Sequence, residues 1–114
     1  MLSPLHTAIS GLRASMDLVR ASAHNRANSL TDGFKKEVVH LSEGATGGVV
    51  VDIEKSSEPG PIHYSPEGTP IEGSNVDLAD ETVNLILAEN LFAANIAAIK
   101  TADEMEGTLL DLLA

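Results

Sequence analysis

The sequence predicts a mainly α-helical protein with a small β part, in which long N- and C-terminal helices pack as an antiparallel, coiled-coil-like pair. Three observations carry this prediction. Apolar residues recur at alternating spacings of three and four near both ends of the 114-residue chain, as in a helix that faces a partner helix. Two short runs rich in valine lie between those ends, and four of the five prolines gather in residues 56–73.

The N-terminal segment predicts a helix from about Pro4 to about Leu30. Ser3 supplies a capping hydroxyl, and the ring of Pro4 fits the first helical turn. The helix should end at Thr31-Asp32-Gly33, where glycine can adopt a left-handed turn. Gly11 costs about 1 kcal/mol relative to alanine inside a helix, so we expect it to have a packing reason. The seam expected to face a partner helix comprises Leu5, Ile9, Leu12, Met16, Val19 and Ala23.

The middle of the chain predicts a β-hairpin followed by an irregular connector. Residues 34–42 and 48–55 read as strands joined by a turn at 43–47. A two-stranded hairpin alone is weak in water, so it should lie on the helices or on a neighbouring molecule. Residues 56–73 read as the connector, because proline removes hydrogen-bond donors and glycine adds freedom.

The C-terminal segment predicts a helix of about 35 residues. Asn75 and Asp77 offer capping side chains, and the first turn is acidic, as the helix dipole favours. Its apolar face is wider than one partner helix can cover, which points to assembly. Asn95 lies on that face, where a single polar residue can fix the register of two helices. The packing residues predicted for this helix are Leu85, Phe92, Asn95, Ile99, Met105 and Leu109.

These segments divide the chain into an N-terminal helix and turn (1–33), a hairpin and connector (34–73) and a C-terminal helix (74–114). Together they are expected to form one domain.

Composition argues against several classes of function. The formal net charge is −10, and the seven basic residues are scattered, which disfavours nucleic acid and anionic membrane surfaces. We expect no membrane insertion, because we find no apolar run of about 18 residues. No cysteine is present, and the four histidines lack metal-ligand spacing. We therefore expect no catalytic residues, metal, cofactor or small-molecule substrate, and no cleaved signal peptide.

Both ends of the chain carry motifs that resemble those of the bacterial flagellar rod and hook family. The N-terminal motifs are Ser10-Gly11-Leu12, then residues 23–28 (Ala-His-Asn-Arg-Ala-Asn), then Thr31-Asp32-Gly33-Phe34-Lys35. The C-terminal motifs are residues 74–78 (Ser-Asn-Val-Asp-Leu), 83–86 (Val-Asn-Leu-Ile), 92–95 (Phe-Ala-Ala-Asn) and 99–111. The motif residues that we expect to matter for assembly or packing are Asn25, Asn28, Gly33, Phe34, Asn75, Asp77 and Asn95.

The resemblance implies a structural subunit that polymerises through its terminal helices and contributes to motility. Its expected partners are copies of itself, other rod or hook subunits and the flagellar type III export apparatus, and its expected place is the periplasmic rod of the basal body. The short middle suits a proximal-rod type. The alternatives are a minor accessory axial paralogue and a helical-hairpin adaptor that binds one partner helix.

Two residues depart from the family pattern at seam positions. Arg26 stands where the pattern has isoleucine, and Glu106 where it has leucine. A buried unpaired charge costs several kcal/mol. Since antiparallel helices in one molecule would keep these residues apart, we hypothesise that they pair between subunits. Arg26→Ile would then leave the monomer folded but alter assembly.

Overall fold

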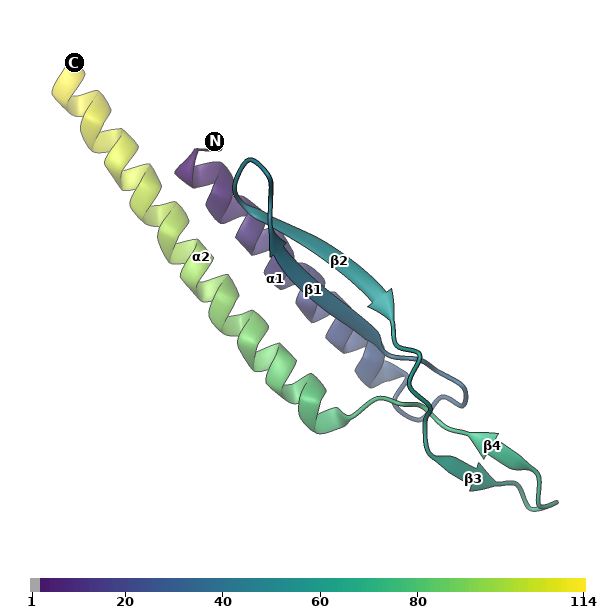
Figure 1. Cartoon of the computed structure of the whole chain (residues 1–114). Coiled ribbons are helices and arrows are strands. Elements are labelled where there is room, and N and C mark those ends of the chain that lie inside the picture. The colour runs from purple at the N-terminus through teal and green to yellow at the C-terminus, as the bar shows by residue number, and fades with distance from the viewer. Residues whose placement is uncertain (1–2) are drawn as a thin grey trace.

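The computed structural model describes residues 3–114 and contains two long helices, two small hairpins and their connections (Figure 1). The order along the chain is α1 (Pro4–Ala27), β1 (Glu37–Glu43), β2 (Val49–Lys55), β3 (Ile62–Tyr64), β4 (Pro70–Glu72) and α2 (Leu78–Leu113). The molecule is elongated, measuring 79 × 24 × 14 Å. The predicted mainly helical class with a small β part is confirmed. Met1 and Leu2, which belong to the predicted N-terminal segment, lie outside the described residues.

Helix α1 begins and ends through local hydrogen bonds. The Ser3 hydroxyl accepts a bond from the His6 N–H at 3.2 Å, and Pro4 occupies the first helical position as predicted. The helix ends at Ala27, three residues earlier than predicted. Asn28 explains this difference, because its side chain donates to the His24 carbonyl and its own backbone leaves the helical region. Gly33 has a φ of +72°, the left-handed turn that glycine was predicted to make.

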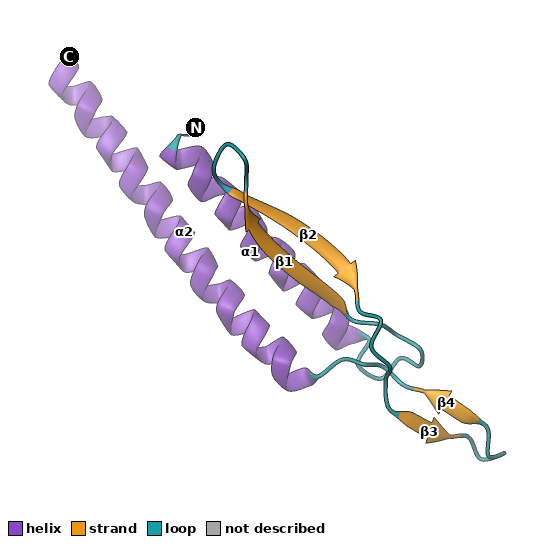
Figure 2. Ribbon diagram, in the orientation of Figure 1, coloured by secondary structure: helices purple, strands orange, loops and turns teal. Residues whose placement is uncertain are grey.

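Strands β1 and β2 pair antiparallel, with Glu37 opposite Lys55 and Glu43 opposite Val49. They form the predicted hairpin, although β1 begins three residues later than the predicted run. The turn contains two glycines with positive φ, Gly47 and Gly48. The hairpin lies along α1, on a different side from α2 (Figure 2). The Ser10 hydroxyl accepts a bond from the Val49 N–H at 3.0 Å.

The connector is not wholly irregular, so the prediction for residues 56–73 was wrong in part. Strands β3 and β4 form a second antiparallel hairpin at the far end of the molecule from the C-terminus (Figure 1). Pro70 fits because it is the first residue of its strand, a position that tolerates the missing N–H. A turn with Gly68 at a φ of +85° closes the hairpin, and the Ser65 N–H donates to the Thr69 carbonyl.

Helix α2 begins where the sequence predicts. The Asp77 carboxylate accepts bonds from the Ala79 and Asp80 N–H groups. At about 1.5 Å per residue, its 36 residues make a helix of about 54 Å, against about 36 Å for α1. It runs antiparallel to α1 and continues past the beginning of that helix (Figure 1). By length and composition alone α2 could cross a membrane, contrary to the expectation that the chain has no apolar segment long enough. Of its apolar window, 6% is buried.

The buried face of α1, which packs against α2 and the first hairpin, consists mostly of small residues. On α1 the buried positions are Ala8, Gly11, Ala14, Ser15, Leu18, Ala21, Ser22 and Asn25, and on α2 they are Glu81 and Ala88. The predicted α1 seam lies beside this stripe and not within it. Leu5, Ile9 and Leu12 are half-buried, whereas Met16 and Val19 are exposed. Small side chains let the backbones approach closely, so the larger apolar residues remain on the outer side.

Candidate functional site

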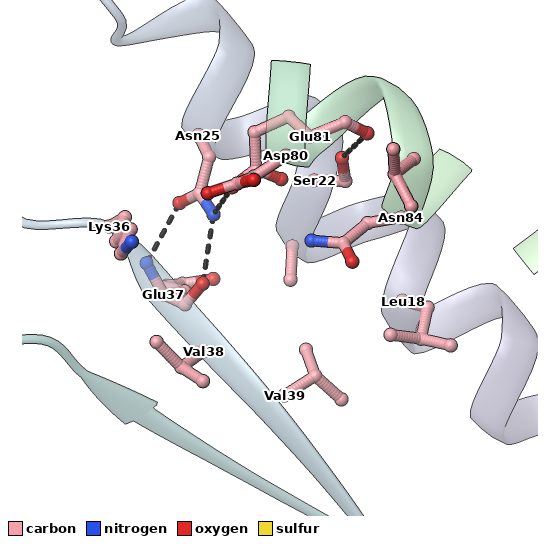
Figure 3. A pocket seen from close by; sticks show the side chains of 12 residues that line it. Leu18, Ser22, Asn25, Lys36, Glu37, Val38, Val39, Asp80, Glu81 and Asn84 are labelled. Carbon is pink, nitrogen blue, oxygen red and sulfur yellow. Dashed lines mark hydrogen bonds between the residues drawn. The ribbon is translucent and has the colours of Figure 1, made fainter. Parts of the chain in front are cut away.

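A buried polar network joins α1, β1 and the first turns of α2. The Asn25 side chain accepts a bond from the Glu37 N–H and donates to the Glu37 carbonyl, both at 2.8 Å. The same amide donates to Glu81 Oε1 at 3.0 Å, and the Ser22 hydroxyl donates to the Glu81 carbonyl at 3.0 Å. Figure 3 shows the Asn25 amide between the Glu37 backbone and the Glu81 side chain. One side chain thus fixes three elements.

Glu81 is the one residue in this network with an incomplete set of partners. It is 3% exposed, and its second carboxylate oxygen, Oε2, has no hydrogen-bond partner among the described residues. The network borders a cavity of about 340 Å³ whose walls come from α1, β1 and α2, including Leu18, Val39 and Asn84. A buried carboxylate is costly unless it is paired. Removing the Asn25 amide should therefore lower the free energy of unfolding substantially.

A second junction holds the start of α2 against the segment before β1. Asn75 Oδ1 accepts a bond from the Lys36 N–H at 2.7 Å, and its amide donates to the Glu58 carbonyl at 3.0 Å. The Asn75 N–H donates to the Phe34 carbonyl, and the Phe34 ring packs edge-on against His24 with centroids 5.4 Å apart. Asn75 thus orders the chain between the hairpins and α2.

At the end of β4, Glu72 binds two donors. Its carboxylate pairs with the Lys35 ammonium and accepts a bond from the Gly60 N–H at 2.8 Å. Lys35 also donates to the Glu58 carbonyl. The Lys35 hydrogen bond, followed by the Gly60 N–H, lowers the pKa of Glu72 below its ordinary value, because both favour the charged carboxylate.

The Glu72 contacts should weaken in acid. A folded-state pKa below the unfolded value means that the contribution to stability is present above the unfolded value and is lost as pH falls through the folded one. We expect the Gly60 amide signal to titrate with a midpoint below that of an ordinary glutamate, about 4.3. NMR titration measures this midpoint. Glu72→Gln should abolish the transition, whereas Glu67→Gln, in the β3–β4 turn, should not; an ordinary midpoint at Gly60 would contradict the prediction.

Gly11 of α1 lies directly against the Asn95 side chain of α2. A Cβ atom at Gly11 would lie 2.5 Å from Asn95 Oδ1, so no larger side chain fits without a shift. The Asn95 amide donates to the Leu91 carbonyl at 2.8 Å, which holds the side chain in place. The packing reason expected for Gly11 is thus the Asn95 side chain of the partner helix.

The structure separates the sequence-predicted site residues into three groups. Asn25, Asn28, Gly33, Phe34, Asn75, Asp77 and Asn95 take part in the caps, turns and junctions described above. Leu5, Ile9, Leu12, Leu85 and Ile99 are half-buried, and Met16, Val19, Phe92, Met105 and Leu109 are exposed.

Sequence reasoning missed Ser22, Glu81 and the Lys35–Glu72 pair. From the sequence, Glu81 is only one of the acidic residues in the first turn of α2, which the helix dipole favours. The spacing of Ser22 and Asn25, three apart on the small-residue face, was the one available signal for the network.

Within residues 3–114, no group of three histidine, cysteine or acidic side chains could hold a metal ion. The polar clusters consist of hydrogen bonds that join elements of the fold. The hydrogen bonds form a junction at one end of the helix pair. Beyond this junction the helices present uncovered apolar surface.

Comparison with known proteins finds similarity to flagellar axial proteins, mainly in the C-terminal part of the chain. Residues 71–112 match the model of the flagellar basal body rod FlgEFG protein C-terminal segment, which here comprises Ile71–Asp77 and nearly all of α2. The flagellar hook protein FlgE of Helicobacter pylori is 35% identical over 74 residues, which cover 65% of this chain and 10% of that protein. These matches, which centre on the C-terminal part of the chain, support a protein of the flagellar basal-body rod and hook family.

A second family relative matches a shorter stretch. The flagellar hook protein FlgE of Escherichia coli is 45% identical over 42 residues, which cover 37% of this chain and 10% of that protein. The chain thus spans about a tenth of the length of the curated family members that it matches. Asn75, Asp77, Glu81 and Asn95 all lie within the segment matched by the family model.

Proposed function

We propose that this chain is a structural subunit of the flagellar axis, of the small rod type, that polymerises through its terminal helices and performs no catalysis. Similarity to flagellar rod and hook proteins supports the axial role. The short region between the helices, residues 28–77, supports the rod type. Its partners are copies of itself and other axial subunits. We further propose that it reaches the periplasmic rod through the flagellar export apparatus, without a cleaved signal peptide.

The observation that carries the proposal is how little of α2 is covered. Of its 36 residues, all of them described, two are buried: Glu81 and Ala88. Large apolar side chains project from it over its whole length, including Val83, Ile86 and Phe92. A soluble monomer rarely exposes so much contiguous apolar surface, and such surface marks an interaction site. Neighbouring subunits would bury it.

Lipid is the other solvent that could cover α2, since the helix is long and apolar enough to cross a membrane. Protein neighbours fit better. The first turns of α2 are tied to α1 and β1 by Glu81 and Asn25, and Asn95 is seated on Gly11. A helix held in this way lies beside α1 over most of its length, an arrangement that fits protein neighbours better than lipid.

The test is genetic. The coding region for residues 76–114 is deleted in the source bacterium, and motility and assembled rods are scored by swimming assays and electron microscopy of basal bodies. We expect loss of both, with recovery when the full chain is supplied in trans. Normal rods and motility after the deletion would overturn the proposal in favour of an accessory or adaptor role.

A solution measurement separates a subunit from an adaptor. A subunit should associate progressively as its concentration rises in size-exclusion chromatography. An adaptor should remain a single small species with a sharp thermal transition.

A further inference from the structure

Helix α2 continues well beyond the helix that it packs against. The first residue of α1, Pro4, lies in a groove with Ala98, Thr101 and Ala102 of α2. From Asp103 to the C-terminus every residue is exposed. We call residues 103–113 the overhang; at about 1.5 Å per residue it is about 16 Å long. Met105, Leu109 and Leu112 of the overhang are 67%, 56% and 78% exposed.

Helix α1 has an uncovered side of its own. The hairpin covers one side, through Ser10 and Asn25, and α2 covers a second, through Gly11 and Ser22. The remaining side carries the predicted seam, which we call the outer face of α1. On this face Met16 and Val19 are 51% and 44% exposed, and Leu5, Ile9 and Leu12 are half-buried.

The two surfaces carry opposite charge, although the whole chain is strongly acidic. The overhang has four carboxylates, Asp103, Glu104, Glu106 and Asp111, and no lysine or arginine. Helix α1 has three arginines, Arg13, Arg20 and Arg26, against one aspartate, Asp17, which pairs with Arg20 at 2.8 Å. The chain has seventeen acidic and seven basic residues, so a helix with an excess of arginines is unusual in it. The outer face of α1 is therefore complementary in charge to the apolar, acidic overhang.

We propose that the overhang of one copy docks on the outer face of α1 of a second copy. This inference rests on the proposed function and names the contact through which the chain polymerises. Copies repeated in one orientation along the long axis would set the overhang antiparallel to the neighbour's α1. Glu104 and Glu106 then lie toward the Arg20–Arg26 end, and the leucines lie over Met16 and Val19.

The contact joins two different surfaces of the same chain, so each copy keeps one of them free. Such a heterologous contact repeats into an open assembly unless its rotation closes a ring. An interface built on about three helical turns is small compared with about 800 Å² per partner in a standard complex. A single contact should therefore be weak, and association should depend strongly on concentration.

Two charge-reversal variants test the contact on the full chain. The face variant carries Arg20→Glu and Arg26→Glu, and the overhang variant carries Glu104→Lys and Glu106→Lys; all four residues are exposed. Sedimentation velocity should show that each variant alone associates roughly tenfold or more weakly than the unmodified chain. Lys55→Glu and the pair Glu43→Lys, Asp52→Lys, on the exposed part of the hairpin, are the matched controls and should associate normally.

Mixing the face variant with the overhang variant gives the decisive test of the contact. In the mixture, the reversed overhang of one variant meets the reversed α1 face of the other. The unmodified overhang of the face variant also meets the unmodified α1 face of the overhang variant, so association should be restored as an alternating assembly with 1:1 stoichiometry. Circular dichroism checks that each variant is folded. If the overhang variant associates like the unmodified chain, or if the mixture associates no better than either variant alone, the inference is wrong. A face variant that still forms dimers would show overhang-to-overhang pairing and would also overturn it.

The outcome is distinguishable from failure of the proposed function. If the variants associate normally while loss of the chain abolishes motility, the docking contact is wrong and the axial role stands. If the variants behave as expected while rods form without the chain, the contact stands and the axial role is wrong.

Discussion

Asn25→Ala should lower the free energy of unfolding by about 3 kcal/mol or more. The substitution removes two bonds to the Glu37 backbone and the bond to Glu81, and it leaves a buried carboxylate without its amide partner. Small domains have total stabilities of only about 5–15 kcal/mol, so the hairpin should detach from α1 or the whole fold should be lost. Urea unfolding followed by circular dichroism measures the change, and hydrogen exchange at the Glu37 amide reports the hairpin.

Asn28→Ala is the matched control for this substitution. Asn28 lies three residues further along, and among residues 3–114 its side chain bonds only to its local neighbours His24 and Thr31. Its replacement should cost about 1 kcal/mol or less. Glu81→Gln should also be milder than Asn25→Ala, because it removes the buried charge and keeps an oxygen for the Asn25 amide. Equal losses for Asn25→Ala and Asn28→Ala would show that the network does not hold the three elements together.

Gly11→Leu should destabilise the helix pair by roughly 2–3 kcal/mol. Leucine is the better helix former, by up to about 1 kcal/mol, so isolated helix propensity predicts the opposite sign. The contact with Asn95 decides the result, because the first added carbon would already lie 2.5 Å from its side-chain oxygen. Thermal and urea unfolding measure the change.

A double-mutant cycle isolates this contact. Asn95→Ala removes the side chain that Gly11 accommodates, so Gly11→Leu should cost much less in the Asn95→Ala background. Gly107→Leu is the matched control: Gly107 lies in the overhang with no atom within 4 Å of its added carbon, so this change should be neutral or stabilising. A stabilising Gly11→Leu would disprove close approach of the helices at this point.

The predictable parts of the fold were those governed by local chemistry. Ser3 with Pro4 and Asp77 mark the beginnings of the two helices, and Gly33 marks the turn after α1. The β3–β4 hairpin could not be predicted from the sequence, because its strands have three residues each and lie among prolines and glycines. The network around Glu81 was also hidden, since its members are 56 and 59 residues apart in sequence.

The sequence by itself determined the two long helices, the first hairpin and the excess of apolar helical surface, because capping, turn chemistry and periodicity act over a few residues. Only the tertiary structure decided which face of α1 meets α2. A seam of larger apolar residues stood beside a stripe of small ones, and periodicity is the same for both. The packing of the Asn95 side chain on Gly11 and the hydrogen bond between Asn25 and Glu81 favour the small stripe. That choice leaves the larger side chains on the outer face of α1, where a second copy can reach them.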